Sequence, residues 1–211
     1  NKLLTPEDEL GAFDVDPRFE VNLFATEREF PDLACPIQMR WDARGRLWVS
    51  CSTTYPHVYP GNEPNDKIII LEDTDGDGRA DQRDVLFQGF VEGNQQHRVN
   101  GFSRGLDNWI YCANGDSGGK IRSTMTGKTV DISGRDFRIQ PDSGRIDTQA
   151  GQTQFGRRRD DWGNWFGCNN SNPMWHFVLG DHYLRRNPHL PAPNSRVNVS
   201  VTPGAAPVFP I

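Results

Sequence analysis

The segment Cys35–Ser50 reads CPIQMRWDARGRLWVS, which is a short apolar stretch, a polar turn and a second stretch that contains tryptophan. The same order of features recurs in His97–Cys112, around LDNWIY, and in Thr153–Cys168, around DWGNWF. Short apolar stretches separated by turn residues are typical of antiparallel strand pairs. A recurrence about every sixty residues is typical of β-sheet units that follow one another along the chain. The sequence therefore predicts an all-β fold.

We interpret each repeat as the start of one β-propeller blade, whose four strands radiate from a central channel. The resulting units are an N-terminal segment with an outer strand over 1–34, a first blade with a calcium hairpin over 35–96, a second blade over 97–152, and a third blade with an exit loop over 153–211. About three blades cannot close a ring, because a propeller needs at least about four. We therefore expect the N-terminal half of a six-bladed ring, completed by the same or another chain. The alternative is a self-contained domain of three β-sheets.

Two further strand pairs can be placed inside these units. Lys67–Leu71 and Val85–Phe87 are apolar and contain β-branched residues, so we expect them to pair as a hairpin around the loop that joins them. Gly134–Ile139 and Pro141–Ile146 meet at Pro-Asp-Ser-Gly, a combination that favours a tight turn. The second pair is predicted to form the outer hairpin of the second blade.

The loop at 73–84 reads DTDGDGRADQRD and has the ligand spacing of a twelve-residue calcium loop, with a glycine at the sixth position for a sharp turn. The predicted ligands are the carboxylates of Asp73, Asp75, Asp77, Asp81 and Asp84, with the main-chain carbonyl of Arg79. So many carboxylates repel one another unless a divalent cation offsets their charge. Since strands and not helices flank the loop, we expect a structural ion and not a sensor. The alternative is an acidic surface turn.

Composition limits the possible partners. The 211 residues carry a net charge of −5 and contain 35% apolar residues, 21 Gly and 15 Pro, which fits a chain with many turns and short strands. Such a charge leaves no broad basic surface for nucleic acid, and Arg157–Arg159 is either a solvated loop or a local phosphate site. No apolar run is long enough to predict a membrane span.

Two features of the sequence bear on the cellular compartment of the protein. The chain starts at Asn1, which fits removal of an export signal as well as a trimmed segment, and a calcium loop suits a periplasmic or extracellular location. The four cysteines are Cys35, Cys51, Cys112 and Cys168, and their spacing matches no metal motif. They are either small core residues or partners in one or two disulfides, with Cys35 and Cys51 the candidates for a pair across a hairpin.

The segment Asn94–Asn100, NQQHRVN, is unusually polar for the start of an inner strand. Imidazole exchanges a proton near neutral pH, so His97 is the best candidate for a general base. Asp116, in NGDSGG, follows the neighbouring strand and could turn back to orient the His97 ring. The alternative is a solvated histidine beside a glycine-rich turn.

Five motifs are spread over essentially the whole chain. They are PEDEL at 6–10, FEVNLFA at 19–25, GRLWV at 45–49, LEDTDGDG at 71–78 and GRDFR at 134–138. Together they resemble the planctomycete-type membrane-bound dehydrogenase β-propellers, which are similar to the sorbosone and soluble quinoprotein glucose dehydrogenases. The resemblance implies a six-bladed propeller that uses pyrroloquinoline quinone with calcium to oxidise a sugar-like alcohol or aldehyde. Electrons would then pass to a cytochrome c, whose haem lies on a missing segment or partner.

The resemblance also assigns roles to residues. In the quinoprotein glucose dehydrogenases the base is a His before an inner strand, and its partner Asp follows in a Gly-Asp motif at the spacing that separates His97 from Asp116. His97 would thus take the substrate's hydroxyl proton, and Asp116 would orient it. The candidate cofactor contacts are Gln96, Arg98, Asn100 and Gln152, the last at a position where those enzymes place an arginine.

Two other functions fit the same residues. One is a non-catalytic propeller that binds a glycan or a protein partner, with the calcium hairpin stiffening its rim. The other is a structural subunit of an electron-transfer complex that holds a metal or haem through histidines near the channel mouth, where His57 and His176 join His97.

Overall fold

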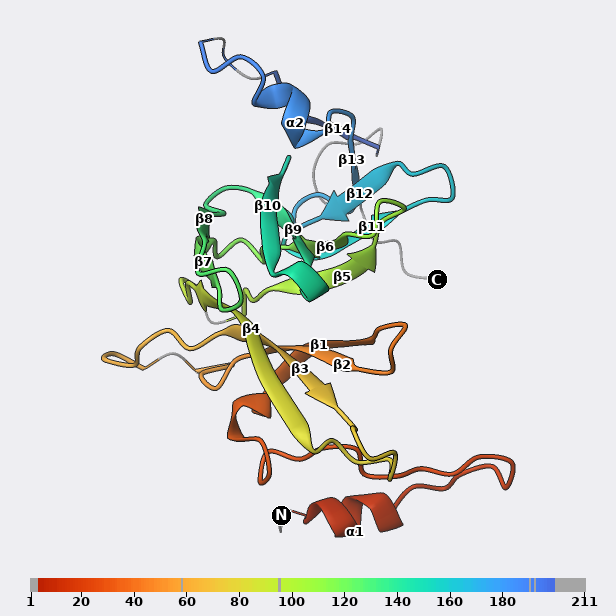
Figure 1. The fold of residues 1–211 in the computed structure, drawn as a ribbon. Coiled ribbons are helices and arrows are strands. Elements are labelled where there is room, and N and C mark those ends of the chain that lie inside the picture. Colours follow the sequence, from red (N-terminus) through yellow and green to blue (C-terminus); the bar gives the residue numbers. More distant parts are fainter. Residues whose placement is uncertain (1–3, 58, 95, 190, 192, 200–211) are drawn as a thin grey trace, which may run out of the picture.

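Three antiparallel β-sheets form most of the molecule in a computed structural model that describes residues 4–57, 59–94, 96–189, 191 and 193–199 (Figure 1). The helices are short: α1 (Pro6–Gly11), α2 (Asp181–Leu184) and the 3-10 turns η1 (Pro31–Leu33) and η2 (Pro141–Ser143). None of the helices in the described part of the chain has the length and apolar character needed to cross a bilayer. Helix α1 lies at one end of the molecule, below the first sheet, and α2 lies at the opposite end (Figure 1).

The three sheets follow the chain in order. The first contains β1 (Pro36–Trp41), β2 (Leu47–Cys51), β3 (Lys67–Glu72) and β4 (Gln82–Phe90), the second contains β5 (Asn100–Arg104), β6 (Ile110–Ala113), β9 (Asp136–Gln140) and β10 (Arg145–Gln149), and the third contains β11 (Phe155–Arg159), β12 (Trp165–Cys168), β13 (Trp175–Phe177) and β14 (Arg196–Asn198). In each sheet these four strands pair in the order in which they follow along the chain, although β7 and β8 intervene between β6 and β9. The first strand of each set lies at a sheet edge, and β5 contacts both β1 and β11.

The strand pairs predicted from the repeats are confirmed. Each repeat forms one pair, β1–β2, β5–β6 or β11–β12, and the two predicted hairpins are β3–β4 and β9–β10. The all-β prediction is therefore confirmed, with three sheets in place of the three predicted blades. Residues 200–211 of the third predicted unit lie outside the described residues.

One hairpin was not predicted and joins two of the sheets. Strands β7 (Gly119–Ser123) and β8 (Thr129–Asp131) follow β6 in the chain but extend the first sheet, because β7 pairs with β4. Glycines permit the close approach of β4 and β7. A Cβ on Gly89 would lie 2.5 Å from the Lys120 carbonyl oxygen, and a Cβ on Gly119 would lie 2.5 Å from the Gly89 carbonyl oxygen. The hairpin thereby ties the second predicted unit to the outer edge of the first.

The core lies on both faces of the first sheet. Successive side chains of a strand point to opposite faces, so Trp48, Ile68 and Ile70 pack toward the second sheet, while Val49 and Ile69 pack toward the N-terminal segment. The first cluster is completed from the second sheet and the β7–β8 hairpin by Phe102, Cys112, Ile121, Ile132, Phe137, Ile139 and Ile146. Burial of both faces explains why the sequences of β2 and β3 are continuously apolar.

The cysteines are free thiols. Cys51 and Cys112 are buried within these clusters, which is the core role that the sequence left open for them. Cys35 is half-buried and donates to the Tyr55 carbonyl oxygen, and Cys168 donates to the Phe155 carbonyl oxygen. The Cys35–Cys51 disulfide, which the sequence left open as an alternative, is not formed.

Candidate functional site

Three carboxylates of the β3–β4 loop converge. One oxygen from each of Asp73, Asp75 and Asp81 lies within 4.8 Å of the others, which is close enough for a shared cation. The Asp73 carboxylate is held by two backbone N–H groups, from Gly76 at 2.6 Å and from Gly78 at 2.8 Å. The Gly78 N–H is the main reason why the pKa of Asp73 lies below its ordinary value. This carboxylate is therefore kept ionised and oriented, as a metal ligand must be.

The sequence explains the path of the loop. Gly76 and Gly78 both adopt positive φ angles, 82° and 87°, which side chains rarely tolerate. Asp81 accepts hydrogen bonds from the backbone and the hydroxyl of Thr74, so the last of the three carboxylates is fastened to the start of the loop. The two strands on either side hold the ends of the loop in register.

Two predicted ligands lie outside this group. Asp77 accepts the Arg79 N–H at 2.8 Å, and Asp84 lies within β4, opposite Ile70, where it accepts the Gln82 side-chain amide at 3.0 Å. The hairpin starts pairing at Gln82, so the twelfth loop position is already part of a strand and does not turn back toward the first. The guanidinium of Arg79 pairs with Glu29 at 2.8 Å, and the ligand role of its carbonyl stays a prediction.

The N-terminal segment packs against the same loop. The Asn22 side-chain amide donates to the Gly78 carbonyl oxygen at 2.8 Å, and the Ala80 N–H donates to the Phe24 carbonyl oxygen at 2.7 Å. A Cβ on Gly78 would lie 2.6 Å from the Asn22 side chain, so only glycine permits this contact. A cation in the loop would therefore stiffen both the hairpin and the segment that covers it.

His97 lies just before β5 and is half-buried. Its Nε2 atom lies 2.5 Å from the side-chain nitrogen of Gln154, and the Oε1 atom of Gln154 accepts the Asn170 N–H at 3.0 Å. Since Gln154 Oε1 is occupied as an acceptor, its NH2 group donates to His97 Nε2. Gln154 therefore holds the Nε2 side of the His97 ring.

The predicted His97–Asp116 pair is not assembled. No hydrogen bond or ion pair joins the two side chains, both of which the structure describes. Asp116 takes a left-handed backbone conformation with φ of 60°, and its N–H donates to Asn114 Oδ1. The loop touches His97 through its main chain, because the Ser117 hydroxyl donates to the His97 carbonyl oxygen at 2.6 Å. This loop therefore fixes the backbone of His97 and not its imidazole.

The predicted cofactor contacts are mostly engaged elsewhere. Arg98 is buried in an ion pair with Asp66, and the Asn100 side chain bonds the Arg98 and Gln154 carbonyl oxygens and the Gly156 N–H. Gln96 is exposed, and the Gln152 carbonyl oxygen accepts from Arg196. The residue that meets His97 is Gln154, two positions beyond Gln152. Arg98 is the only cationic residue of these four predicted contacts and is paired with Asp66, so this set leaves no free cationic group for the carboxylates of a quinone.

A buried charge cluster beside His97 was missed. Arg98 lies 3.1 Å from Asp66, and Glu92 accepts the Asn65 N–H at 2.5 Å together with the Thr54 hydroxyl. Burial raises the pKa of Asp66 to about 7, and the adjacent Glu92 contributes to the rise. Burial also opposes ionisation of Glu92, but the Asn65 N–H and the Thr54 hydroxyl hold its pKa below the ordinary value. Asp66 and Glu92 therefore share a proton opposite one guanidinium.

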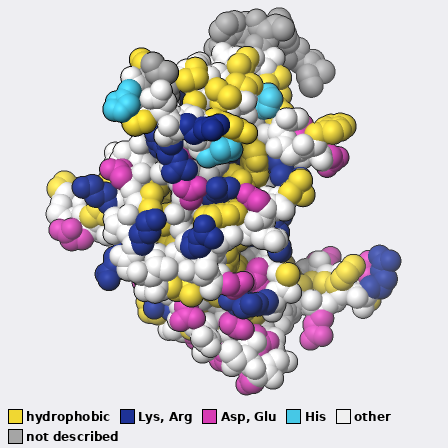
Figure 2. All heavy atoms as spheres, turned by 45° about the horizontal axis from the view of Figure 1, so that its top comes forward, with side chains coloured by type: hydrophobic (Ala, Val, Ile, Leu, Met, Phe, Trp, Pro, Cys, Tyr) yellow, Lys and Arg dark blue, Asp and Glu magenta, His cyan; other side chains and the backbone are white. Residues whose placement is uncertain are grey.

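No sequence pattern marked this cluster, because its members come from two loops far apart in the chain. The nearest signal was the polar segment at 94–100, which contains Arg98. In Figure 2, His side chains lie beside Lys and Arg side chains on the upper part of the face.

The comparison with family models gives two overlapping matches, to residues 5–84 and 67–211, which together cover almost the whole chain. The chain belongs to the family described as "Domain of unknown function (DUF7133)". No curated protein and no solved structure matches it. Membership of the DUF7133 family therefore leaves the function to be inferred from the geometry above.

Proposed function

We propose that this chain is part of a calcium-binding β-propeller that serves as a binding module for a glycan or protein partner. The convergence of Asp73, Asp75 and Asp81 in a loop fixed at both ends by strands carries the calcium part of this proposal. Support for a propeller comes from three successive antiparallel sheets, each with four strands paired in chain order, in which the first strand of the second sheet contacts the first strands of the other two. The remaining blades would come from the same or another chain, in a periplasmic or extracellular setting where calcium is abundant.

The ion acts as a staple in this proposal. It offsets the repulsion among three carboxylates and fastens the β3–β4 loop, to which Asn22 and Phe24 of the N-terminal segment are hydrogen-bonded. Binding to the folded state alone stabilises a protein by about 2.7 kcal/mol when free calcium is at a hundred times its Kd. Calcium is therefore expected to raise the unfolding temperature without changing the fold.

Calorimetric titration and thermal unfolding with calcium or with a chelator test this proposal. Asp75→Asn is expected to abolish saturable calcium binding and the calcium-dependent rise in Tm. Asp84→Asn is the matched control, because Asp84 lies in β4 outside the converging group. No calcium binding by the native chain contradicts the proposal. Equal losses of calcium binding in Asp75→Asn and Asp84→Asn would instead support the full set of ligands that the sequence predicts for the twelve-residue loop.

A dehydrogenase is the second candidate, and the half-buried His97 favours it. The Nε2 lone pair of His97 could accept the hydroxyl proton of a sugar-like alcohol or aldehyde hydrate once Gln154 moves away. Against it stand the missing contact with Asp116 and the lack of a free cationic side chain among Gln96, Arg98, Asn100 and Gln152. Transfer of electrons to a cytochrome c belongs to this candidate alone.

Reconstitution with pyrroloquinoline quinone and calcium, followed by dye reduction over a panel of sugars, separates the two candidates. Turnover that is lost in His97→Ala and kept in His176→Ala supports the dehydrogenase. No turnover, or turnover that is the same in both variants, rejects it and leaves the binding module. Asp116→Asn tests whether Asp116 acts on His97. Little effect on turnover is expected, because the Asp116 side chain makes no hydrogen bond or ion pair with the His97 ring.

A further inference from the structure

A cavity of about 400 Å³ lies between the first and second sheets, near the turns that end β1 and β5. Arg104 is the last residue of β5, whereas His97 precedes its first residue, so the cavity and the His97 region lie at opposite ends of this strand. Its volume falls within the range of small-molecule sites, about 300–1,000 Å³. Neither the calcium loop nor the His97 region contributes a residue to its lining.

The charges in the cavity are unbalanced. Four arginines and two aspartates line it, namely Arg40, Arg44, Arg46 and Arg104 with Asp42 and Asp142. Arg46 pairs with Asp42 at 2.7 Å and with Asp142 at 3.0 Å, and Arg44 pairs with Asp142 at 3.2 Å. Arg40 and Arg104 pair with no carboxylate among the described residues, which leaves two positive charges uncompensated in a chain whose net charge is −5.

A third arginine adds to the positive field. Arg158, on β11, donates to the Phe102 carbonyl oxygen at 2.9 Å, and Arg40 points to the same oxygen at 3.5 Å. Burial, together with the positive charge of Arg40, lowers the pKa of Arg158. Two guanidinium groups that meet at one neutral carbonyl repel each other, and an anion nearby would relieve that repulsion.

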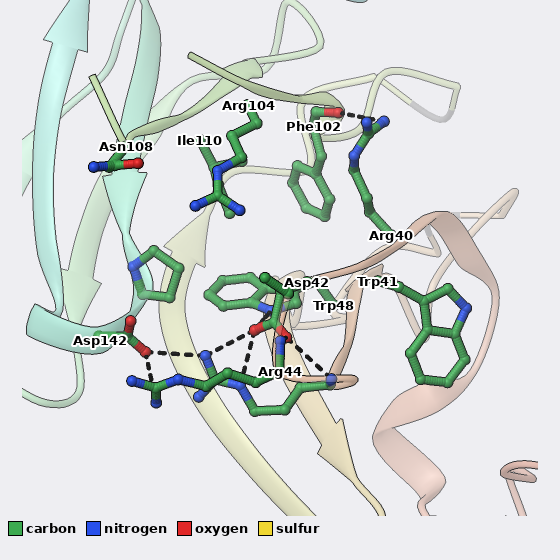
Figure 3. A pocket seen from close by; sticks show the side chains of 13 residues that line it. Arg40, Trp41, Asp42, Arg44, Trp48, Phe102, Arg104, Asn108, Ile110 and Asp142 are labelled. Carbon is green, nitrogen blue, oxygen red and sulfur yellow. Dashed lines mark hydrogen bonds and ion pairs between the residues drawn. The ribbon is translucent and has the colours of Figure 1, made fainter. Parts of the chain in front are cut away.

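The cavity also has an apolar wall with a fixed orientation. Trp48, Phe102 and Ile110 line it, and the Trp48 indole N–H donates to Asp42 at 3.1 Å, which holds the ring in place. Figure 3 shows Arg104 directed into the open space between Ile110 and Phe102, while Arg44 and Asp142 lie joined on the opposite side. A ligand there would meet a guanidinium and an apolar surface at once.

We propose that this cavity binds a small organic oxoanion, in which a carboxylate, phosphate or sulfate group contacts Arg104 and Arg40 and a ring-sized body packs on Trp48 and Ile110. Guanidinium groups match the planar oxygen pairs of such anions, and charge-assisted hydrogen bonds of this kind are about twice as strong as neutral ones. The paired Arg44 and Arg46 form the rim and hold the β1–β2 turn in shape. The site is independent of calcium and of any chemistry at His97.

Calorimetric titrations of the 211-residue chain at constant ionic strength test this proposal with two matched pairs of probes. Phenyl phosphate and benzoate are the anionic probes, phenol and benzamide are their neutral analogues, and inorganic phosphate lacks the ring. Saturable binding of an anionic probe, at least about tenfold tighter than its neutral analogue, is expected. Phosphate-specific and carboxylate-specific sites are distinguished by which anionic probe binds tighter.

Variants locate the site. Arg104→Gln and Arg40→Gln are each expected to weaken binding about tenfold, because each removes one charged donor. The control is Arg122→Gln, which changes an exposed β7 arginine that makes no ion pair with any described residue and lies outside the cavity. Equal affinity for anionic and neutral probes, or equal affinity in Arg104→Gln and Arg122→Gln, overturns the proposal. Inorganic phosphate that binds as tightly as phenyl phosphate overturns the role of the apolar wall.

Discussion

Two buried ion pairs of the same kind behave differently in this molecule. Asp136 and Arg157 join the second and third sheets, and Asp66 and Arg98 join the loops beside His97. Asp136 is fully buried, and its two oxygens accept four hydrogen bonds from Asn114, Thr153 and Arg157. Asp66 is 5% exposed, has an oxygen without a hydrogen-bond partner, and shares its surroundings with a second carboxylate, Glu92.

The difference shows how the neighbours of an ion pair decide its role. Burial raises the pKa of Asp136 as well, but the charge of Arg157 and the hydrogen bonds from Thr153 and Arg157 oppose that rise, and this pair acts as a link between sheets. Around Asp66 there are two carboxylates for one arginine, so the two carboxylates retain one proton until the pH rises through about 7. The first pair is expected to contribute to stability through its four hydrogen bonds, whereas the second makes stability depend on pH near neutrality.

The largest effect is expected from Asp136→Asn. The substitution leaves Arg157 buried without a counter-charge, and breaking a buried pair in this way costs about 3–5 kcal/mol of folding free energy. Urea unfolding measures the loss. Asp161→Asn is the control, because Asp161 is exposed and makes no ion pair among the described residues. Similar unfolding midpoints for both variants would contradict the role assigned to Asp136.

A smaller and pH-dependent effect is expected from Asp66→Asn. The folded pKa of Asp66, about 7, is above the value near 3.9 of an unfolded chain, so its contribution to stability is present at low pH and is lost as the pH rises through 7. The Asn variant mimics the protonated carboxyl and should not show this loss. Tm measured between pH 5 and pH 8 should therefore fall less in the variant, and parallel curves would contradict the shared proton.

Glu92 determines how stability changes with pH on the acidic side. Its folded pKa is below the ordinary value, so its contribution to stability is present above the unfolded pKa and is lost as the pH falls through the lower folded value. Together the two carboxylates predict that this cluster is most stabilising near the unfolded pKa values of the pair, about 3.9 to 4.3, and that its stabilisation declines as the pH rises toward the folded pKa of Asp66. Glu92→Gln should remove the loss on the acidic side in the same thermal measurements.

The smallest effect is expected at an exposed pair. Arg79 and Glu29 lie 2.8 Å apart, but about half of each side chain is in solvent, with exposed fractions of 49% and 42%. Exposed pairs contribute about 0–1 kcal/mol because solvent and salt screen them. Glu29→Gln should therefore shift the urea midpoint slightly, and less at high salt. A loss of folding free energy as large as that of Asp136→Asn would show that burial does not explain the difference in strength between these two ion pairs.

The predictions from sequence succeeded where the signal was local. The Asp42 carboxylate accepts the N–H groups of Arg44 and Arg46, and Asp160 accepts those of Trp162 and Asn164, so the repeated turns are encoded within a few residues. The path of the acidic loop is equally local in Asp73, Gly76 and Gly78, while calcium binding there stays a prediction. Asp84 lies outside the converging group because it is paired opposite Ile70 in β4, and its ligand role also stays a prediction.

Sequence alone determined the strand pairs of the three repeats and of two hairpins, their turns, and the acidic loop in which Asp73, Asp75 and Asp81 converge, since alternation and short-range hydrogen bonds depend only on neighbouring residues. Tertiary structure decided which distant groups meet: Gln154 and not Asp116 at the His97 ring, Glu92 beside Asp66, and Arg104 beside the apolar wall of Trp48. The physical reason is that burial and charge pairing act through space, so their outcome depends on how three sheets pack and not on any single segment.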